Sequence, residues 1–120
     1  MSIEERIVPE GQGLAVPSEP FSVETRPDRE RVIVVPFGEL DMATVGRVAA
    51  EIDDLAARGF DAIVLDLRAT SFIDSSGVHL LLKQTARRDI RVTLIDGGQP
   101  VRRVIDLAGI RELLPFEAAP

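Results

Sequence analysis

The chain has 120 residues, of which 45% are hydrophobic and 28% charged, and its formal net charge is −6 at pH 7. This length fits one domain that can bury a hydrophobic core, and the composition is typical of a soluble globular protein. The acidic balance argues against nucleic-acid binding, because the basic residues are dispersed and no aromatic platform accompanies them.

The composition does not indicate a membrane protein or a disulfide-stabilised one. No apolar stretch approaches the roughly 20 residues that a membrane-spanning helix needs, and the sequence does not start with a basic region followed by an apolar one. Because cysteine is absent, the sequence offers no disulfide, no thiolate chemistry and no cysteine-based metal site. We therefore expect a cytoplasmic protein.

The first predicted elements are a tail and a hairpin. Prolines and glycines with little hydrophobic periodicity predict a mobile tail over residues 1–20, followed by one domain over residues 21–117. Apolar and polar residues alternate over residues 21–25, as in a half-exposed strand. A turn then leads to a more buried strand over residues 31–36. We expect Pro36 to help end this strand, because it lacks a backbone N–H.

A helix and a buried strand come next. Asp41 is a good helix N-cap, and apolar residues follow it at helical spacing as far as Gly59, which we expect to end the helix. Residues 62–67 are apolar apart from Asp66, which is typical of a strand covered by helices on both faces. The remaining predicted elements are a helix from about residue 75 to 88, a strand over 91–95, a helix over 99–108 and a short edge strand over 113–117.

This order of elements predicts an α/β fold with a mixed, mostly parallel sheet. We expect four to five strands with the hairpin at the N-terminal side, flanked by three to four helices. In open α/β sheets, functional groups gather beyond the carboxyl ends of the strands. Two of these ends carry polar residues, at 39–41 and at 74–76, and neighbouring strands would bring both loops onto one surface.

The most informative stretch is Asp74-Ser75-Ser76-Gly77, which follows a buried strand and a short loop and opens a helix. It puts a hydroxyl where free backbone N–H groups and the positive end of a helix dipole meet solvent. A kinase can reach such a hydroxyl, and a phosphate there would change the local charge sharply. Helix capping is the simpler explanation for at least one serine. Both interpretations hold if Asp74 or Ser75 caps the helix while Ser76 projects outward.

The helix that follows carries one apolar residue on its expected outer side. Val78 and Leu82 lie on the side that we expect to be buried, whereas Ser76, Leu80 and Lys83 lie opposite. An apolar Leu80 beside a hydroxyl and a basic group is typical of a docking surface. Packing of Leu80 against a neighbouring helix is an equally open interpretation.

Three segments resemble the landmarks of the STAS family, whose name abbreviates sulfate transporter and anti-sigma factor antagonist. They are residues 34–41, which end in Gly-Glu-Leu-Asp, residues 66–78, which contain Asp-Ser-Ser-Gly, and residues 101–110, which resemble the family's last helix and its glycine stop. In this order they cover roughly residues 21–116. The resemblance implies the STAS fold.

Within the family, the sequence resembles anti-sigma factor antagonists of the sporulation and stress-response type. The resemblance implies that the unphosphorylated chain binds an anti-sigma factor with serine kinase activity and so releases the sigma factor. Phosphorylation of Ser76, with Ser75 as the second candidate, would block binding, and a serine phosphatase would restore it. The expected partner-binding residues are Glu39, Asp41, Asp74, Ser75, Ser76, Gly77, Leu80 and Lys83. We expect no catalytic residue, cofactor or metal, no nucleic-acid or membrane partner, and a monomer or weak dimer.

Two other functions stay open. One is a non-switching STAS scaffold or transporter-accessory module, which stable high-order oligomers would favour. The other is a small hydrolase or nucleotide-binding enzyme that uses Ser76 and the acidic loops. His79 invites a hydrolase interpretation, but the sequence has no Gly-x-Ser-x-Gly elbow and places no carboxylate to orient the ring. A metal site lacks support as well, because no calcium-loop or histidine-ligand spacing appears.

Overall fold

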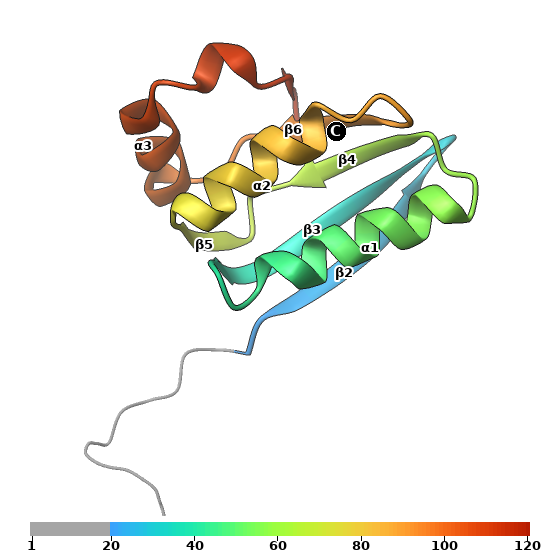
Figure 1. Ribbon diagram of the computed structural model, residues 1–120, viewed down its shortest axis with the longest axis horizontal. Helices are drawn as coiled ribbons and strands as arrows, with labels where there is room; N and C mark the ends of the chain where they lie inside the picture. Colours follow the sequence, from blue (N-terminus) through green and yellow to red (C-terminus); the bar gives the residue numbers. More distant parts are fainter. Residues whose placement is uncertain (1–19) are drawn as a thin grey trace, which may run out of the picture.

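The computed structural model describes residues 20–120. The tail predicted over residues 1–20 lies outside the described residues except for Pro20, so the tail and the domain boundary after it stay predictions. In chain order the elements are β2 (Ser22–Asp28), β3 (Arg31–Leu40), α1 (Val45–Ala57), β4 (Ala62–Asp66), β5 (Thr70–Ile73), α2 (Ser75–Thr85), β6 (Arg91–Ile95), α3 (Gln99–Ala108), the 3₁₀ turn η1 (Arg111–Leu113) and β7 (Phe116–Glu117) (Figure 1).

A mixed sheet of six strands forms the centre of the fold. Five strands follow the order β2-β3-β4-β6-β7, and β5 pairs with β3 away from this path. β2 and β3 form an antiparallel hairpin from Ser22 opposite Phe37 to Asp28 opposite Arg31, and the other pairs are parallel. The predicted α/β class, the N-terminal hairpin and the mostly parallel sheet are confirmed, with one strand more than expected.

The additional strand is β5, which falls where the sequence predicted only a short loop. β3 has two successive partners along one edge: β4 pairs with it over Val32–Val34, and β5 pairs with it from Gly38 to Leu40. Pro36 lies between the residues of β3 that pair with β4 and those that pair with β5. Its missing N–H therefore removes no hydrogen bond from either parallel ladder. The prediction that Pro36 helps end the strand is therefore wrong. The Pro36 carbonyl accepts a hydrogen bond from Thr70 Oγ1 at 3.2 Å, which ties β5 to β3 at this point.

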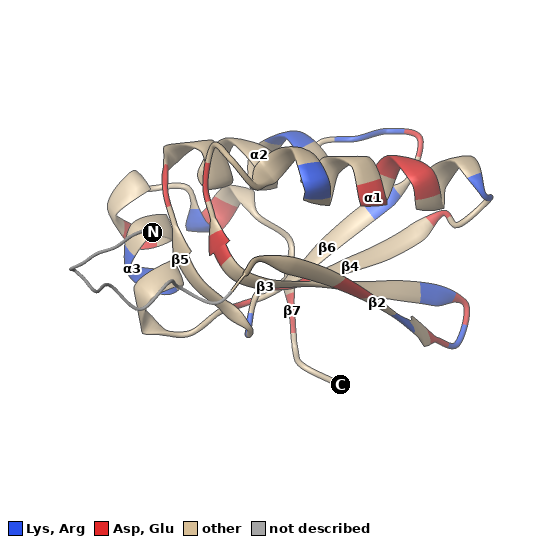
Figure 2. Ribbon diagram, turned by 90° about the horizontal axis from the view of Figure 1, so that it is seen from below, with Lys and Arg blue, Asp and Glu red and all other residues tan. Residues whose placement is uncertain are grey.

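Helices α1 and α2 cover one face of the sheet (Figure 2). α1 buries Val48, Ile52 and Leu55, which recur every three or four residues and so line one side of the helix. They pack in the main core with inward-facing strand residues such as Val34 and Leu65. α3 lies against β5 at the end of the sheet where the chain leaves β3 (Figure 1).

The opposite face of the sheet carries no helix within residues 20–120 (Figure 2). Its apolar centre is nevertheless buried, because the side chains of neighbouring strands cover it. Asp66 is only 3% exposed, and its carboxylate accepts hydrogen bonds from the backbone N–H of Arg68 and from its guanidinium, the latter including Nε to Oδ1 at 3.0 Å and Nη2 to Oδ2 at 2.8 Å. Burial alone would raise the pKa of Asp66, but the hydrogen bonds from Arg68 outweigh it and hold this pKa below its usual value.

Several elements, among them α2 and β7, have bounds other than the predicted ones, whereas the bounds of β6 and α3 agree with the prediction. α2 ends at Thr85, three residues earlier than expected, and Arg87 instead binds Asp53 of α1 through Nη1 at 2.6 Å and Asp89 through Nη2 at 2.8 Å. β7 holds only two residues, because η1 occupies the segment before it. The ion pair between Arg87 and Asp53 connects the segment after α2 to α1, a long-range contact that helical periodicity does not reveal.

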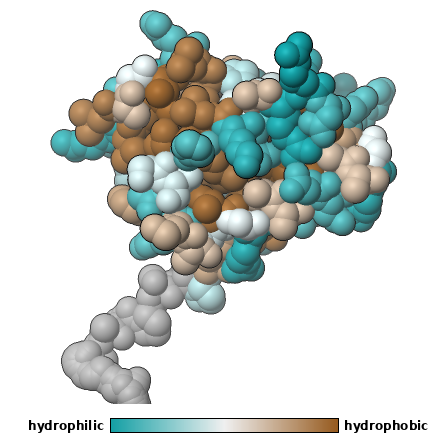
Figure 3. Space-filling view, in the orientation of Figure 1, coloured by the Kyte–Doolittle hydropathy of each residue, from teal (hydrophilic) through white to brown (hydrophobic). Residues whose placement is uncertain are grey.

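The described surface has one prominent apolar corner. Leu107 near the end of α3 and Leu113 in η1 are 80% and 69% exposed, and Figure 3 shows hydrophobic side chains gathered over this part of the molecule. None of the helices within residues 20–120 has both the length and the apolar character that crossing a membrane requires.

Candidate functional site

The loops at 39–41 and 74–76 meet at one end of the sheet, as the sequence predicted. β5 brings them together, because Leu40 pairs with Ile73 at the last position of the β3–β5 ladder. The next residue, Asp74, donates its backbone N–H to the Leu40 carbonyl at 3.3 Å. The start of α2 is thereby attached directly to the end of β3.

Asp74 is the residue that caps α2. Its backbone is extended, and Oδ1 accepts hydrogen bonds from the N–H groups of Ser76 at 2.8 Å and Gly77 at 3.1 Å. Because the carboxylate satisfies these two free N–H groups, neither serine is needed as a cap. Within residues 20–120, the side chains of Ser75 and Ser76 take part in no hydrogen bond, so both hydroxyls remain available for other chemistry.

The two serines lie in a shallow, open hollow of about 390 Å³, which Val45 of α1 and His79 of α2 complete. Ser75 is exposed and Ser76 is half-buried, while His79 is exposed. The hollow is therefore formed where the first turns of α1 and α2 lie next to each other. A macromolecular partner can reach both hydroxyls from solvent.

Gly77 is a packing residue rather than a surface residue. A Cβ atom at this position would lie 2.4 Å from Ile73 Cγ1 and 2.7 Å from the Leu40 carbonyl oxygen, closer than real Cβ contacts. The absence of a side chain lets the first turn of α2 approach the ends of β3 and β5. Gly77 thus sets the position of the neighbouring serines.

Our prediction of which face of α2 is exposed is partly wrong. Leu80 is only 6% exposed and belongs to the main core, together with Gly77, Leu81 and Gln84 on the buried side of α2. Of the two interpretations of Leu80, packing is the one that the structure supports, so Leu80 leaves the candidate partner surface. Lys83 is exposed and stays on it. The buried face of α2 is rotated relative to the prediction because this helix also packs against α1.

Asp41 organises the turn before α1 but does not cap the helix itself, since α1 begins at Val45. The Asp41 carbonyl accepts hydrogen bonds from the N–H groups of Thr44 and Val45 at 3.0 and 2.9 Å, and its Oδ1 accepts from the Ala43 N–H at 3.0 Å. Thr44 Oγ1 donates to the Glu39 carbonyl at 2.7 Å. Thr44 was not among the predicted site residues, although a threonine directly before an apolar helix start is a recognisable signal.

The rim of the hollow is acidic. Glu39 is exposed, and Asp41 and Asp74 are half-buried. Figure 2 shows acidic segments at this end of the sheet, close to the start of α2. A negatively charged group added to either serine would therefore enter a region that already carries negative charge.

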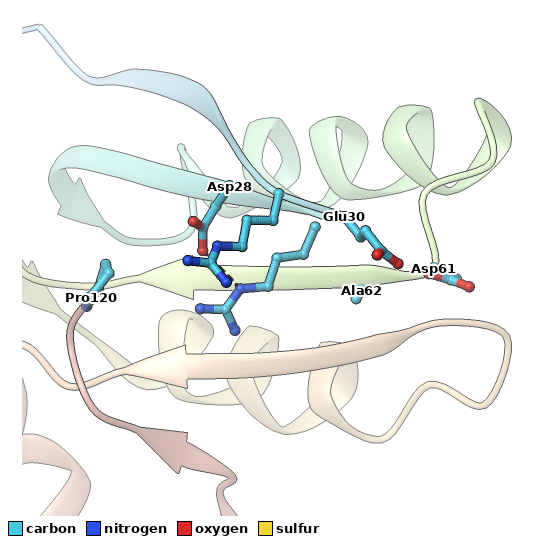
Figure 4. A pocket seen from close by; sticks show the side chains of 7 residues that line it. Asp28, Glu30, Asp61, Ala62 and Pro120 are labelled. Carbon is cyan, nitrogen blue, oxygen red and sulfur yellow. Dashed lines mark hydrogen bonds and ion pairs between the residues drawn. The ribbon is translucent and has the colours of Figure 1, made fainter.

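A larger open depression of about 600 Å³ lies at the opposite end of the sheet, next to the turn of the β2–β3 hairpin (Figure 4). Charged side chains line most of it, and Arg31 binds Asp28 at 2.9 Å and Glu117 at 2.7 Å. Because Arg31 is already held by these two carboxylates and no predicted site residue lines the depression, we take the smaller hollow as the candidate site.

The STAS domain model matches residues 21–119 of the chain. An anti-sigma F factor antagonist from Paenibacillus polymyxa is 31% identical to the chain over 100 residues, which cover 80% of the chain and 86% of that protein.

Solved structures agree with this match. The anti-sigma factor antagonist SpoIIAA in its unphosphorylated form superposes with a TM-score of 0.64 at 30% identity, covering 84% of the chain and 89% of that protein. The phosphorylated form of SpoIIAA from Bacillus matches with a TM-score of 0.58 at 29% identity, covering 84% and 92%. An anti-sigma factor antagonist from Mycobacterium paratuberculosis matches with a TM-score of 0.72 at 24% identity, covering 88% and 92%.

Proposed function

The chain belongs to the STAS domain family, and we propose that it is an anti-sigma factor antagonist whose partner binding is controlled by phosphorylation of Ser76. The observation that carries this proposal is the pair of uncommitted serine hydroxyls at the start of α2, left free because Asp74 caps the helix. The relatives named anti-sigma factor antagonists, including SpoIIAA in unphosphorylated and phosphorylated forms, support the same function.

The proposed binding surface surrounds the hollow at the start of α2. Its exposed or half-buried members are Glu39, Asp41, Asp74, Ser75, Ser76 and Lys83. Gly77 contributes by holding α2 close to the sheet. The proposed partner is an anti-sigma factor with serine kinase activity, and a serine phosphatase would reverse the modification. The chain then acts in the cytoplasm as a ligand and a kinase substrate and catalyses no reaction itself.

Electrostatics gives a physical basis for the switch. A phosphate on Ser76 would add about −1.5 to −2 charges at neutral pH. In the free domain the hollow is open to water, so the charge stays hydrated. In a complex that covers the hollow, the same charge would lose its water next to Asp41 and Asp74, and an unpaired buried charge costs several kcal/mol. Because about 1.4 kcal/mol is a factor of ten in affinity, this penalty is enough to dissociate a micromolar complex.

Titration calorimetry with an anti-sigma factor from the same organism tests the proposal. We expect the wild-type chain and Ser76→Ala to bind with similar affinity, and Ser76→Asp and the phosphorylated chain to bind at least tenfold more weakly. Ser75→Asp is the matched control, because it adds the same charge at the more exposed neighbouring position. Equal affinity for all five proteins would exclude the switch and would favour a non-switching scaffold. A stronger effect at residue 75 would move the modification to Ser75.

A further inference from the structure

The proposed function includes phosphorylation of Ser76, and the following inference rests on it. It concerns the group that contacts the phosphate in the free domain. The backbone N–H groups at a helix start are the usual partners of phosphate. Here the N–H groups of Ser76 and Gly77 already donate to Asp74 Oδ1, at 2.8 and 3.1 Å. Asp74 is itself anionic, so this cap occupies two of the donors at the helix start and also repels a phosphate.

His79 is the side chain placed to take over this role. It lines the same hollow as Ser75 and Ser76, and the fourth lining residue, Val45, offers no polar group. His79 follows Ser76 by three residues and Ser75 by four, spacings that put side chains next to each other on a helix surface. Helical side chains also lean toward the N-terminus of their helix, so the imidazole of His79 extends over the turn that holds the serines.

The His79 ring is free to make a new contact. Within residues 20–120, its side chain takes part in no hydrogen bond or ion pair, and it is exposed. An imidazole carries at least one N–H donor in either neutral form and two when protonated.

We propose that His79 donates a hydrogen bond to the phosphate on Ser76 and holds it over the first turn of α2. His79 is thus a positioning residue of the phosphorylated form. The contact slows dephosphorylation. A phosphatase must displace the imidazole before water attacks phosphorus and the bond between phosphorus and Ser76 Oγ breaks. The unphosphorylated form does not need His79, since a neutral hydroxyl attracts the ring only weakly.

The test uses the full chain with phosphoserine installed at position 76 during translation, so that no kinase is required. We compare the chain containing His79 with His79→Ala by ³¹P NMR of the phosphoserine and ¹⁵N NMR of the imidazole. We expect the ³¹P signal to shift on His79→Ala, and the His79 ring signals to shift when Ser76 carries phosphate. Arg88→Ala serves as the control, because it removes an exposed positive charge outside the hollow.

Hydrolysis by alkaline phosphatase gives the second measurement. We expect His79→Ala to lose its phosphate roughly threefold to tenfold faster, the range for an exposed charge-assisted hydrogen bond. His79→Lys, which places another N–H donor at this position, should recover most of the slow rate, and Arg88→Ala should not change it. Identical ³¹P signals and equal hydrolysis rates with and without His79 would overturn the inference. That result would leave the proposed switch intact, because affinity for the anti-sigma factor is measured separately.

Discussion

Replacing Gly77 by alanine tests whether close packing of α2 on the sheet positions the candidate site. The new Cβ would lie 2.4 Å from Ile73 Cγ1 and 2.7 Å from the Leu40 carbonyl oxygen. The Ile73 side chain can rotate away, but the carbonyl belongs to the backbone of β3 and also accepts the Asp74 N–H. Relief of the contact therefore requires α2 to move away from the sheet, and overpacking of this kind typically costs about 1–3 kcal/mol.

A smaller gain opposes this cost. Alanine stabilises a helix relative to glycine by up to about 1 kcal/mol. The overpacking term exceeds it, so we expect Gly77→Ala to lower the free energy of unfolding by roughly 1–2 kcal/mol. For a domain of about 100 residues this corresponds to a fall in melting temperature of roughly 5–15 °C. Thermal unfolding followed by circular dichroism measures it.

Gly46 supplies a matched control, because it also lies in the first turn of a helix. Nothing lies within 4 Å of a Cβ built at this position. Gly46→Ala should therefore keep only the gain in helix propensity and leave the melting temperature unchanged or raise it by a few degrees. If the alanine variants at 77 and 46 melted at the same temperature, the close approach of α2 to β3 would not be what fixes the serine loop.

Three further predictions concern stability. Asp74→Ala should lower the unfolding free energy by about 0.5–2 kcal/mol in urea titrations, because it removes an N-cap; an unchanged midpoint would contradict the capping role. Arg29 has φ 61° in the hairpin turn, a backbone conformation that favours glycine. Arg29→Gly should therefore raise the unfolding free energy by up to about 1 kcal/mol in the same assay. A clear loss of stability would contradict backbone strain at Arg29. The pKa values of Asp66 and Glu117 are lowered, so their contribution to stability is present above the unfolded-state value near 4 and is lost as the pH falls through the lower folded value. Arg68→Ala removes the side-chain hydrogen bonds and the charge that lower the pKa of Asp66, while the burial that raises it stays. Acid unfolding should therefore begin at a higher pH than in the wild type, and an identical acid transition would refute this role of Arg68.

The sequence by itself determined the elements whose signals are local. The strand over residues 91–95 and the helix over 99–108 have the predicted bounds, because alternation, helical spacing and glycines at the ends are contained within each segment. The role of Asp74 was within reach for the same reason, since a cap joins residues only two or three positions apart. The three resembling segments likewise sufficed to identify the STAS family before any geometry was known.

Only the tertiary structure decided the features that depend on distant segments. β5 forms a strand because it pairs with the part of β3 that extends beyond β4. The four residues of β5 alone do not predict this pairing. Leu80 is buried because α2 packs against α1 as well as the sheet, so the spacing of apolar residues in α2 alone predicted its buried side only in part. The hollow that joins Val45 to His79 exists because two helix starts, more than 25 residues apart in the chain, are brought together by the sheet beneath them. Local patterns set which segments can form an element, and long-range packing sets which of their side chains share a surface.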